Sequence, residues 1–197
     1  MEPFEATLVL SPNGKRLGVL GEEQCRIVFD NQVQRFQRIP NNISAIAMTA
    51  EFLAIAGSDF SIQLFDKQFQ SSRALSMLGS YVAIDIDQRG NRLIAVTEEM
   101  IEVWELASFP NNVLQMKGLK ESGDPVLVHI SNSHVAVLYE RGDVLVLDFE
   151  TQARLKTTLA LEHDIATATF NQNATLLAFV SGGKPFGYDL RTNQLAE

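Results

Sequence analysis

The chain repeats itself about every 40 residues. An aromatic residue or a leucine followed by an acidic residue occurs five times in 197 residues, at steps of 36, 39, 43 and 41 residues. The five pairs are Phe29-Asp30, Phe65-Asp66, Trp104-Glu105, Leu147-Asp148 and Tyr188-Asp189. A small residue inside a short apolar run precedes each pair with nearly the same period. These small residues are Gly18, Ala54, Ala95, Ala136 and Ala178. Two marks with one spacing indicate five equivalent structural units.

Each unit reads as four short strands. The apolar runs of the third unit predict strands over 82–86, 92–97, 100–106 and 113–116, and those of the fourth over 126–130, 134–139, 144–149 and 155–159. Such short runs between turn-forming residues favour strands over helices. Four strands in a period of about 40–45 residues are typical of a β-propeller blade. We therefore predict one all-β domain over residues 1–197, a β-propeller of about five four-stranded blades. The expected blades are roughly 6–40, 44–80, 81–118, 125–161 and 164–197.

Composition narrows the class of protein. With 46% hydrophobic and 20% charged residues, the chain has the balance of an ordinary globular domain. No apolar run approaches the length of about 20 residues that a membrane helix needs, and the N-terminus lacks the basic region of a secretory signal. The single cysteine, Cys25, favours a reducing compartment, so we expect an intracellular protein, cytoplasmic or nuclear. The net charge of −8 makes nucleic acid an unlikely partner.

The predicted fold sorts charge between two faces. In a propeller, the turn between the second and third strands and the link between blades lie on one face, and acidic residues outnumber basic ones there. We expect this acidic loop face to bind basic segments of partner proteins. A solvated surface without a partner is the simpler alternative. The predicted partner-binding residues are Asp59, Phe60, Glu98, Glu99, Glu121, Glu140, Glu162 and Asp164.

Residues for catalysis or metal binding are sparse. The three histidines and one cysteine show no closely spaced ligand pattern, so neither a metal site nor a cofactor is expected. His129 lies in an apolar run, which indicates a satisfied core residue. Asp85 is the lone carboxylate expected on an inner strand, whereas glycoside cleavage needs two facing carboxylates. An alternative function stays open: a five-bladed propeller whose axial pocket binds, or hydrolyses, a glycan or another ligand.

The last unit resembles a repeat of the WD-repeat β-propellers. Glu162-His163-Asp164 is similar to the Gly-His start of such a repeat, 169–178 to its central turn, and Tyr188-Asp189 to its Trp-Asp end. The resemblance implies a rigid, non-catalytic scaffold that presents its loops to peptides or proteins. Residues at the repeat positions, with the junction histidine, are expected to be structural. They are Phe29, Phe65, Trp104, Tyr188 and His163.

The chain also departs from that pattern. Only His163 remains of the junction histidines, and Gly182-Gly183 stands where its aspartate partner is expected. Members of the family usually close with six or seven blades, whereas five units are present here. A compact five-bladed ring, a truncated ring and an open ring closed by another chain are the three alternatives, and we favour an incomplete ring that a partner chain or further residues complete. The expected function is a protein–protein interaction scaffold, as a subunit or domain of an intracellular multiprotein complex.

Overall fold

Twenty strands and one short 3-10 helix are assigned in the described part of the chain. The computed structural model describes residues 7–11, 16–21, 24–29, 32–35, 43–57, 61–66, 71–76, 82–106 and 111–196. The strands form five antiparallel sheets, each made of four strands that follow one another along the chain. The predicted all-β fold of about five four-stranded units is therefore confirmed.

The strands of each sheet run as an up-and-down meander. The first two sheets contain β1 (Thr7–Leu10), β2 (Arg16–Gly21), β3 (Gln24–Phe29), β4 (Gln32–Arg35), β5 (Ile43–Met48), β6 (Leu53–Gly57), β7 (Ser61–Phe65) and β8 (Ser71–Ser76). The other three contain β9 (Ala83–Ile86), β10 (Arg92–Val96), β11 (Met100–Glu105), β12 (Asn111–Lys117), β13 (Pro125–Ile130), β14 (His134–Tyr139), β15 (Asp143–Asp148), β16 (Arg154–Thr158), β17 (Ile165–Phe170), β18 (Leu176–Ser181), β19 (Lys184–Asp189) and β20 (Gln194–Ala196). In the third and fourth sheets, the bounds predicted from the sequence differ from these by at most two residues. The helix, η1 (Lys120–Ser122), lies in the link between those two sheets.

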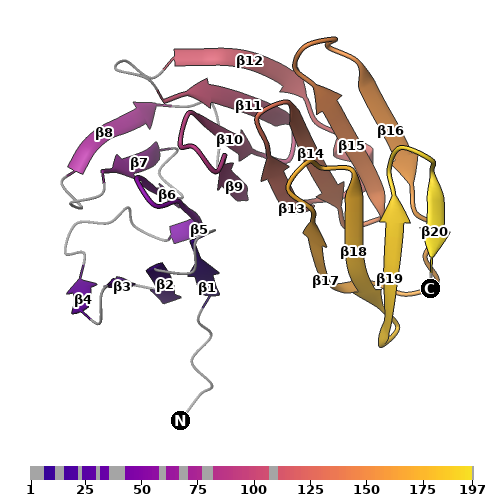
Figure 1. Ribbon diagram of the computed structural model, residues 1–197, viewed down its shortest axis with the longest axis horizontal. Helices are drawn as coiled ribbons and strands as arrows, with labels where there is room; N and C mark the ends of the chain where they lie inside the picture. Colours follow the sequence, from indigo (N-terminus) through magenta and orange to yellow (C-terminus); the bar gives the residue numbers. More distant parts are fainter. Residues whose placement is uncertain are drawn as a thin grey trace.

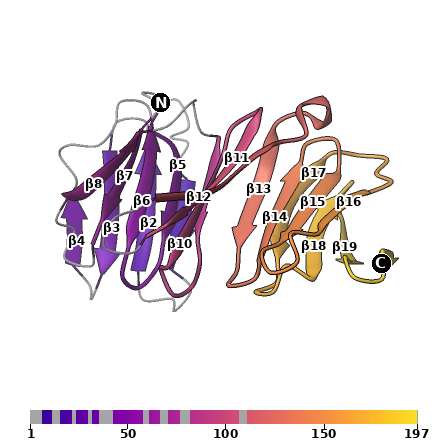
Figure 2. The same cartoon turned by 90° about the horizontal axis from the view of Figure 1, so that it is seen from above.

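The five sheets are arranged as an arc around a common hub (Figure 1). The first strand of each sheet lies toward the inside of the arc, and β8, β12, β16 and β20 lie on its outside. Contacts between β1 and β5, β5 and β9, β9 and β13, and β13 and β17 join the inner strands in chain order. The first and fifth sheets stand at opposite ends of the arc in both views (Figures 1 and 2), so the ring formed by the described residues is open between them.

Three hydrophobic cores fill the spaces between successive sheets from the second to the fifth. Strand β10 shows how the sequence builds them: Leu93 and Ala95 belong to the core shared with the second sheet, and Ile94 to the core shared with the fourth. In β14, Val137 and Ala136 divide in the same way between the third and fifth sheets. Successive side chains of a strand point to opposite faces, and both faces are covered. This is why the middle strands are continuously apolar.

The fifth sheet is covered on one face only. Leu177 and Phe179 of β18 pack against the fourth sheet, whereas Ala178 between them is exposed. In the three preceding sheets the corresponding small residues are fully buried. We call the uncovered side the open face. It consists of Thr167, Thr169, Leu176, Ala178, Val180 and Pro185.

Hydrogen bonds at the hub tie the third, fourth and fifth sheets together. The Asp85 carboxylate of β9 accepts a hydrogen bond from the Ile130 backbone amide (3.0 Å) and lies 3.2 Å from Nδ1 of His129, both on β13. His129 Nε2 lies 3.2 Å from the carbonyl oxygen of Gln172 in the fifth sheet. Gln172 Nε2 in turn donates to Oε1 of Gln88, in the turn after β9 (2.9 Å). Both ring nitrogens of His129 thus face an acceptor, and both are satisfied when the ring is protonated.

The cores between the sheets predict that enlarging two equivalent alanines, Ala136 and Ala178, has different effects on stability. Ala136 pairs with residues of β13 and β15, and Ala178 with the corresponding residues of β17 and β19. Ala136→Leu forces extra methyl groups into a closed core and should lower the free energy of unfolding by about 1–3 kcal/mol. Ala178→Leu, on the open face, should change it by less than about 0.5 kcal/mol. Urea unfolding of both variants checks this, and equal destabilisation would contradict the open face.

The hub also predicts a pH dependence of stability. Burial acts to lower the pKa of His129, but the hydrogen bond and negative charge of Asp85 and the Gln172 carbonyl outweigh it, so the pKa is raised above 6.5. A raised folded-state pKa means that the pair stabilises the fold fully below pH 6.5 and less as the pH rises through the folded-state pKa.

We therefore expect the urea midpoint of the wild type to fall as the pH rises above about 6.5, the ordinary histidine pKa. The fall should be smaller in His129→Gln, which cannot take up the proton. His163→Gln, which changes an exposed histidine, is the matched control and should keep the wild-type slope. Equal slopes for His129→Gln and the wild type would exclude this role of the His129–Asp85 pair.

Candidate functional site

The acidic loop face is assembled by the turns and links at one end of the sheets. In an up-and-down sheet, the turn between the second and third strands and the link to the next sheet lie at the same end. Six of the predicted residues occupy such positions and are exposed; Asp59 and Phe60 lie outside the described residues. The six are Glu98 and Glu99 in the β10–β11 turn, Glu140 in the β14–β15 turn, and Glu121, Glu162 and Asp164 in the links.

Cations of the chain itself neutralise part of this face. Glu99 forms a hydrogen-bonded ion pair with Lys120, whose hydrogen bond and charge lower the pKa of Glu99. Glu140 and Asp164 instead line one open hollow between the fourth and fifth sheets, with a volume of about 500 Å³. Among the described residues, Asp164 and its neighbour Glu162 form no ion pair. Arg141 also lines this hollow, so Glu162 and Asp164 are the described carboxylates without an ion pair at the link between the fourth and fifth sheets.

Asp85 at the hub is held by structural hydrogen bonds. Besides the contacts with β13, its second carboxylate oxygen accepts a hydrogen bond from the Ile86 amide (2.8 Å). A retaining or inverting glycosidase needs a second carboxylate about 5 to 10 Å away, but the group that Asp85 faces is His129. The described residues also contain no cluster of three His, Cys, Asp or Glu side chains that could hold a metal ion. Asp85 thus serves to join two sheets.

The aromatic residues at the repeat positions differ in their surroundings. Phe65 and Tyr188 are buried, and Trp104 packs half-buried against the core between the second and third sheets. The Tyr188 hydroxyl donates to Oδ1 of Asn193 (2.9 Å) and lies 3.0 Å from Oγ1 of Thr157 on the preceding sheet. The indole N–H of Trp104 is buried and has no hydrogen-bond partner among the described residues. Phe29 lies in β3, but its side chain is not among those that the structure describes.

His163 contacts the glycine that stands in place of the expected aspartate. Gly182 has a φ of +56°, and a Cβ atom there would lie 2.3 Å from Cδ2 of the His163 ring. The left-handed conformation and the close contact with the His163 ring both favour glycine at this position. The Ser181 hydroxyl also joins β18 to His163, because it donates a hydrogen bond to the His163 carbonyl oxygen (2.7 Å).

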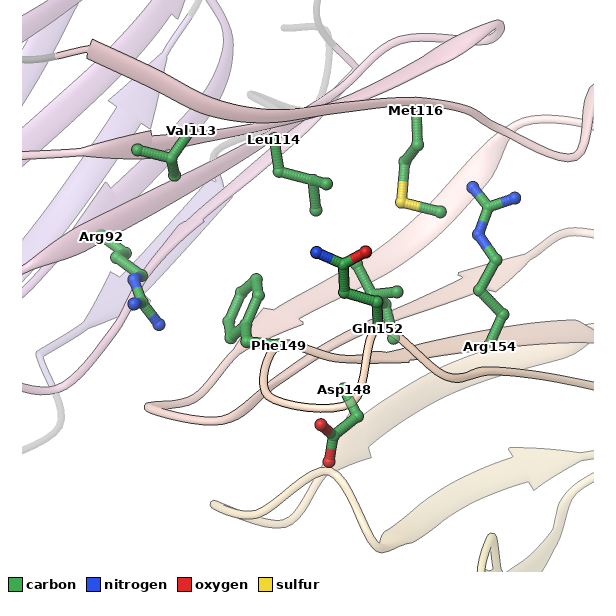
Figure 3. A pocket seen from close by; sticks show the side chains of 9 residues that line it. Arg92, Val113, Leu114, Met116, Asp148, Phe149, Gln152 and Arg154 are labelled. Atoms are coloured by element: carbon green, nitrogen blue, oxygen red, sulfur yellow. The ribbon is translucent and has the colours of Figure 1, made fainter.

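A groove between the third and fourth sheets is the feature that the sequence did not predict (Figure 3). It has a volume of about 350 Å³. Val113, Leu114 and Met116 of β12 form one wall and point toward Phe149 and the β15–β16 turn. We call this the β12–β15 groove. Its volume and apolar walls are those of a small ligand-binding cleft.

Arginines lie at the two ends of the β12–β15 groove, Arg92 from β10 and Arg154 from β16 (Figure 3). Arg92 donates to the carbonyl oxygen of Asn132 (3.0 Å), and its guanidinium carbon lies 4.6 Å from the centre of the Phe149 ring. Asp148, also on the rim, accepts hydrogen bonds from residues of the β15–β16 turn that follows it. Backbone and side-chain hydrogen bonds from Thr151 hold the pKa of Asp148 below its usual value.

Comparison with known proteins gives likenesses of two kinds. No protein-family model matches the chain. In sequence, it is 24% identical over 109 residues to WD repeat-containing protein 19 of Homo sapiens and of Mus musculus. The match includes 54% of this chain but only 8% of those relatives, so the chain spans a small part of their length.

In structure, the chain is similar to the β-propeller domain of Cps50 (Swd1) from Myceliophteria thermophila. The TM-score is 0.73 at 11% identity, over 96% of this chain and 66% of that one. Hydrazine synthase from Kuenenia stuttgartiensis is similar with a TM-score of 0.75 at 12% identity, over 96% and 64%. These identities show the fold alone, and one of the two proteins is an enzyme by name.

Within the described residues, no helix is long and apolar enough to cross a membrane. The repeat of the sequence, the four-stranded sheets around one hub and the likeness to WD repeat-containing protein 19 together support a WD-repeat β-propeller.

Proposed function

We propose that the chain is a non-catalytic protein–protein interaction scaffold, a subunit or domain of an intracellular multiprotein complex. The open face of the fifth sheet is the observation that carries this proposal. Leu176 is 44% exposed there, beside the exposed Ala178. The residues that correspond to Ala178 are buried in each preceding sheet. The open face is therefore a surface that another sheet is expected to cover.

The repeat indicates the chemistry of what covers the open face. Where the fourth sheet meets the fifth, small Ala136 lies in a core with the bulky Leu177 and Phe179 of the next sheet. Ala178 repeats Ala136, so its partner should supply bulky aliphatic or aromatic residues from a further antiparallel sheet. We propose that another chain, or further residues of a longer chain, contributes that sheet.

A charge introduced on the open face tests the completed ring. Leu176→Asp should leave the isolated chain folded, because the position is exposed, but should prevent a second apolar sheet from docking. In affinity capture from the native cells, proteins that co-purify with the wild type should be lost with this variant. Leu155→Asp, at an exposed leucine of β16, is the control and should retain them. Identical captured sets from the two variants would argue against this proposal.

The acidic loop face gives a second, separate test of the scaffold. Glu162→Lys together with Asp164→Lys should weaken binding of a fluorescein-labelled octalysine peptide about tenfold at physiological salt, because two rim charges are reversed. Glu51→Lys with Glu150→Lys reverses two exposed charges on the opposite face and should have little effect. Fluorescence anisotropy measures both affinities. Equal affinities would mean that the acidic loop face is only a solvated surface.

A further inference from the structure

A β-bulge makes the β12–β15 groove apolar. Val103 pairs with Leu114 and Trp104 with Asn112, so Val113 is the extra, unpaired residue of β12. In a regular strand, Val113 and Leu114 would point to opposite faces. The bulge turns Val113 toward the groove, beside Leu114 and Met116 (Figure 3). Val113 is 46% exposed, whereas Met116 is buried, so the apolar wall is accessible at Val113 and closed off at Met116.

The same strand offers backbone groups to an incoming peptide. Strand β12 is the outer strand of its sheet and pairs only with β11 among the described residues. The N–H and C=O groups on its other edge can pair with an extended segment laid beside it. An apolar groove next to a free strand edge recognises a peptide through alternate side chains, one set entering the groove and the other facing solvent.

The ends of the groove are positively charged. Arg154 is exposed, and its side chain forms no hydrogen bond or ion pair with a described residue. The Asp148 carboxylate on the rim is held by hydrogen bonds from Glu150 and Thr151 and lies 3.2 Å from Nε2 of His134, and it forms no ion pair with Arg154. The whole chain carries a net charge of −8, but the Debye length is about 8 Å at physiological salt. The lining of the groove itself holds two arginines and one carboxylate, so its local balance is positive.

We propose that the β12–β15 groove is a docking site for an extended peptide that carries a bulky apolar side chain with an acidic residue nearby. The apolar side chain enters between Met116 and Phe149, and the carboxylate pairs with Arg154. The arginine is suited to this role, since its guanidinium binds a carboxylate with two parallel hydrogen bonds. The groove lies between the third and fourth sheets, so the site does not depend on completion of the ring.

Selection from a random-peptide display library tests this site. Selected peptides should share a bulky apolar residue and an Asp or Glu, and should bind the purified chain in fluorescence polarisation. Arg154→Glu and Val113→Asp should each weaken that binding at least tenfold. Lys184→Glu, an exposed charge reversal on the fifth sheet, and Val126→Asp, at a valine that is 48% exposed, are the matched controls and should bind like the wild type.

Methionine methyl NMR locates the bound peptide. With ¹³C-methyl methionine, a selected peptide should shift the Met116 signal, assigned through Met116→Leu, but not that of Met48, which is buried in β5. A library without enrichment, or peptides whose affinity is equal in Arg154→Glu and the wild type, would overturn the proposal. So would basic peptides that lose affinity only in the Glu162→Lys, Asp164→Lys variant, although these would support the scaffold proposed above.

Discussion

The burial of each sheet face against the next sheet is the interaction on which the whole arc depends. A four-stranded sheet with apolar residues on both sides cannot cover itself, so each middle sheet needs two neighbours. Two adjacent residues of β10 show this need for two neighbours: Leu93 is buried in the core with the second sheet, and Ile94 in the core with the fourth. Stability of such an array is close to a sum of nearest-neighbour terms. The end sheets therefore lack one term each, and the open face of the fifth sheet is the visible consequence.

Polar contacts at the hub fix how one sheet is positioned on the next, which hydrophobic packing alone does not do. Hydrophobic burial is proportional to area and tolerates sliding between faces, whereas hydrogen bonds require defined geometry. The Ile130 amide donates to Asp85 and joins β13 to β9, and the contact of His129 with Gln172 joins β13 to the turn after β17. The Gln172–Gln88 bond spans from the fifth sheet to the third. Together they set how tightly the arc curves over these three sheets.

The sequence predicts the five four-stranded sheets well, because short apolar runs and small residues recur with the period of the fold. Short apolar runs located the strands of the third and fourth sheets to within two residues, and the small residues marked the positions that pack between sheets. The hub could not be predicted in the same way, since Gln88 and Gln172 are 84 residues apart and meet only through the curvature of the arc. The β12–β15 groove was also missed. It depends on a bulge at Val113, and a one-residue shift of register leaves no mark in a hydrophobic pattern.

The groove owes its shape to the same inter-sheet contacts that form the core. Its walls belong to two different sheets, and those sheets share the core in which Met116 and Leu147 are buried. The Asp85–Ile130 bond fixes the two sheets at the hub, and Arg92 bridges them at the rim through Asn132 and Phe149. A cleft held at its inner and outer ends is pre-organised, so a peptide that enters it loses its own freedom but orders little of the protein. The rigidity that a repeated fold requires for stability is thus also what makes a shallow groove between two blades suitable for recognition.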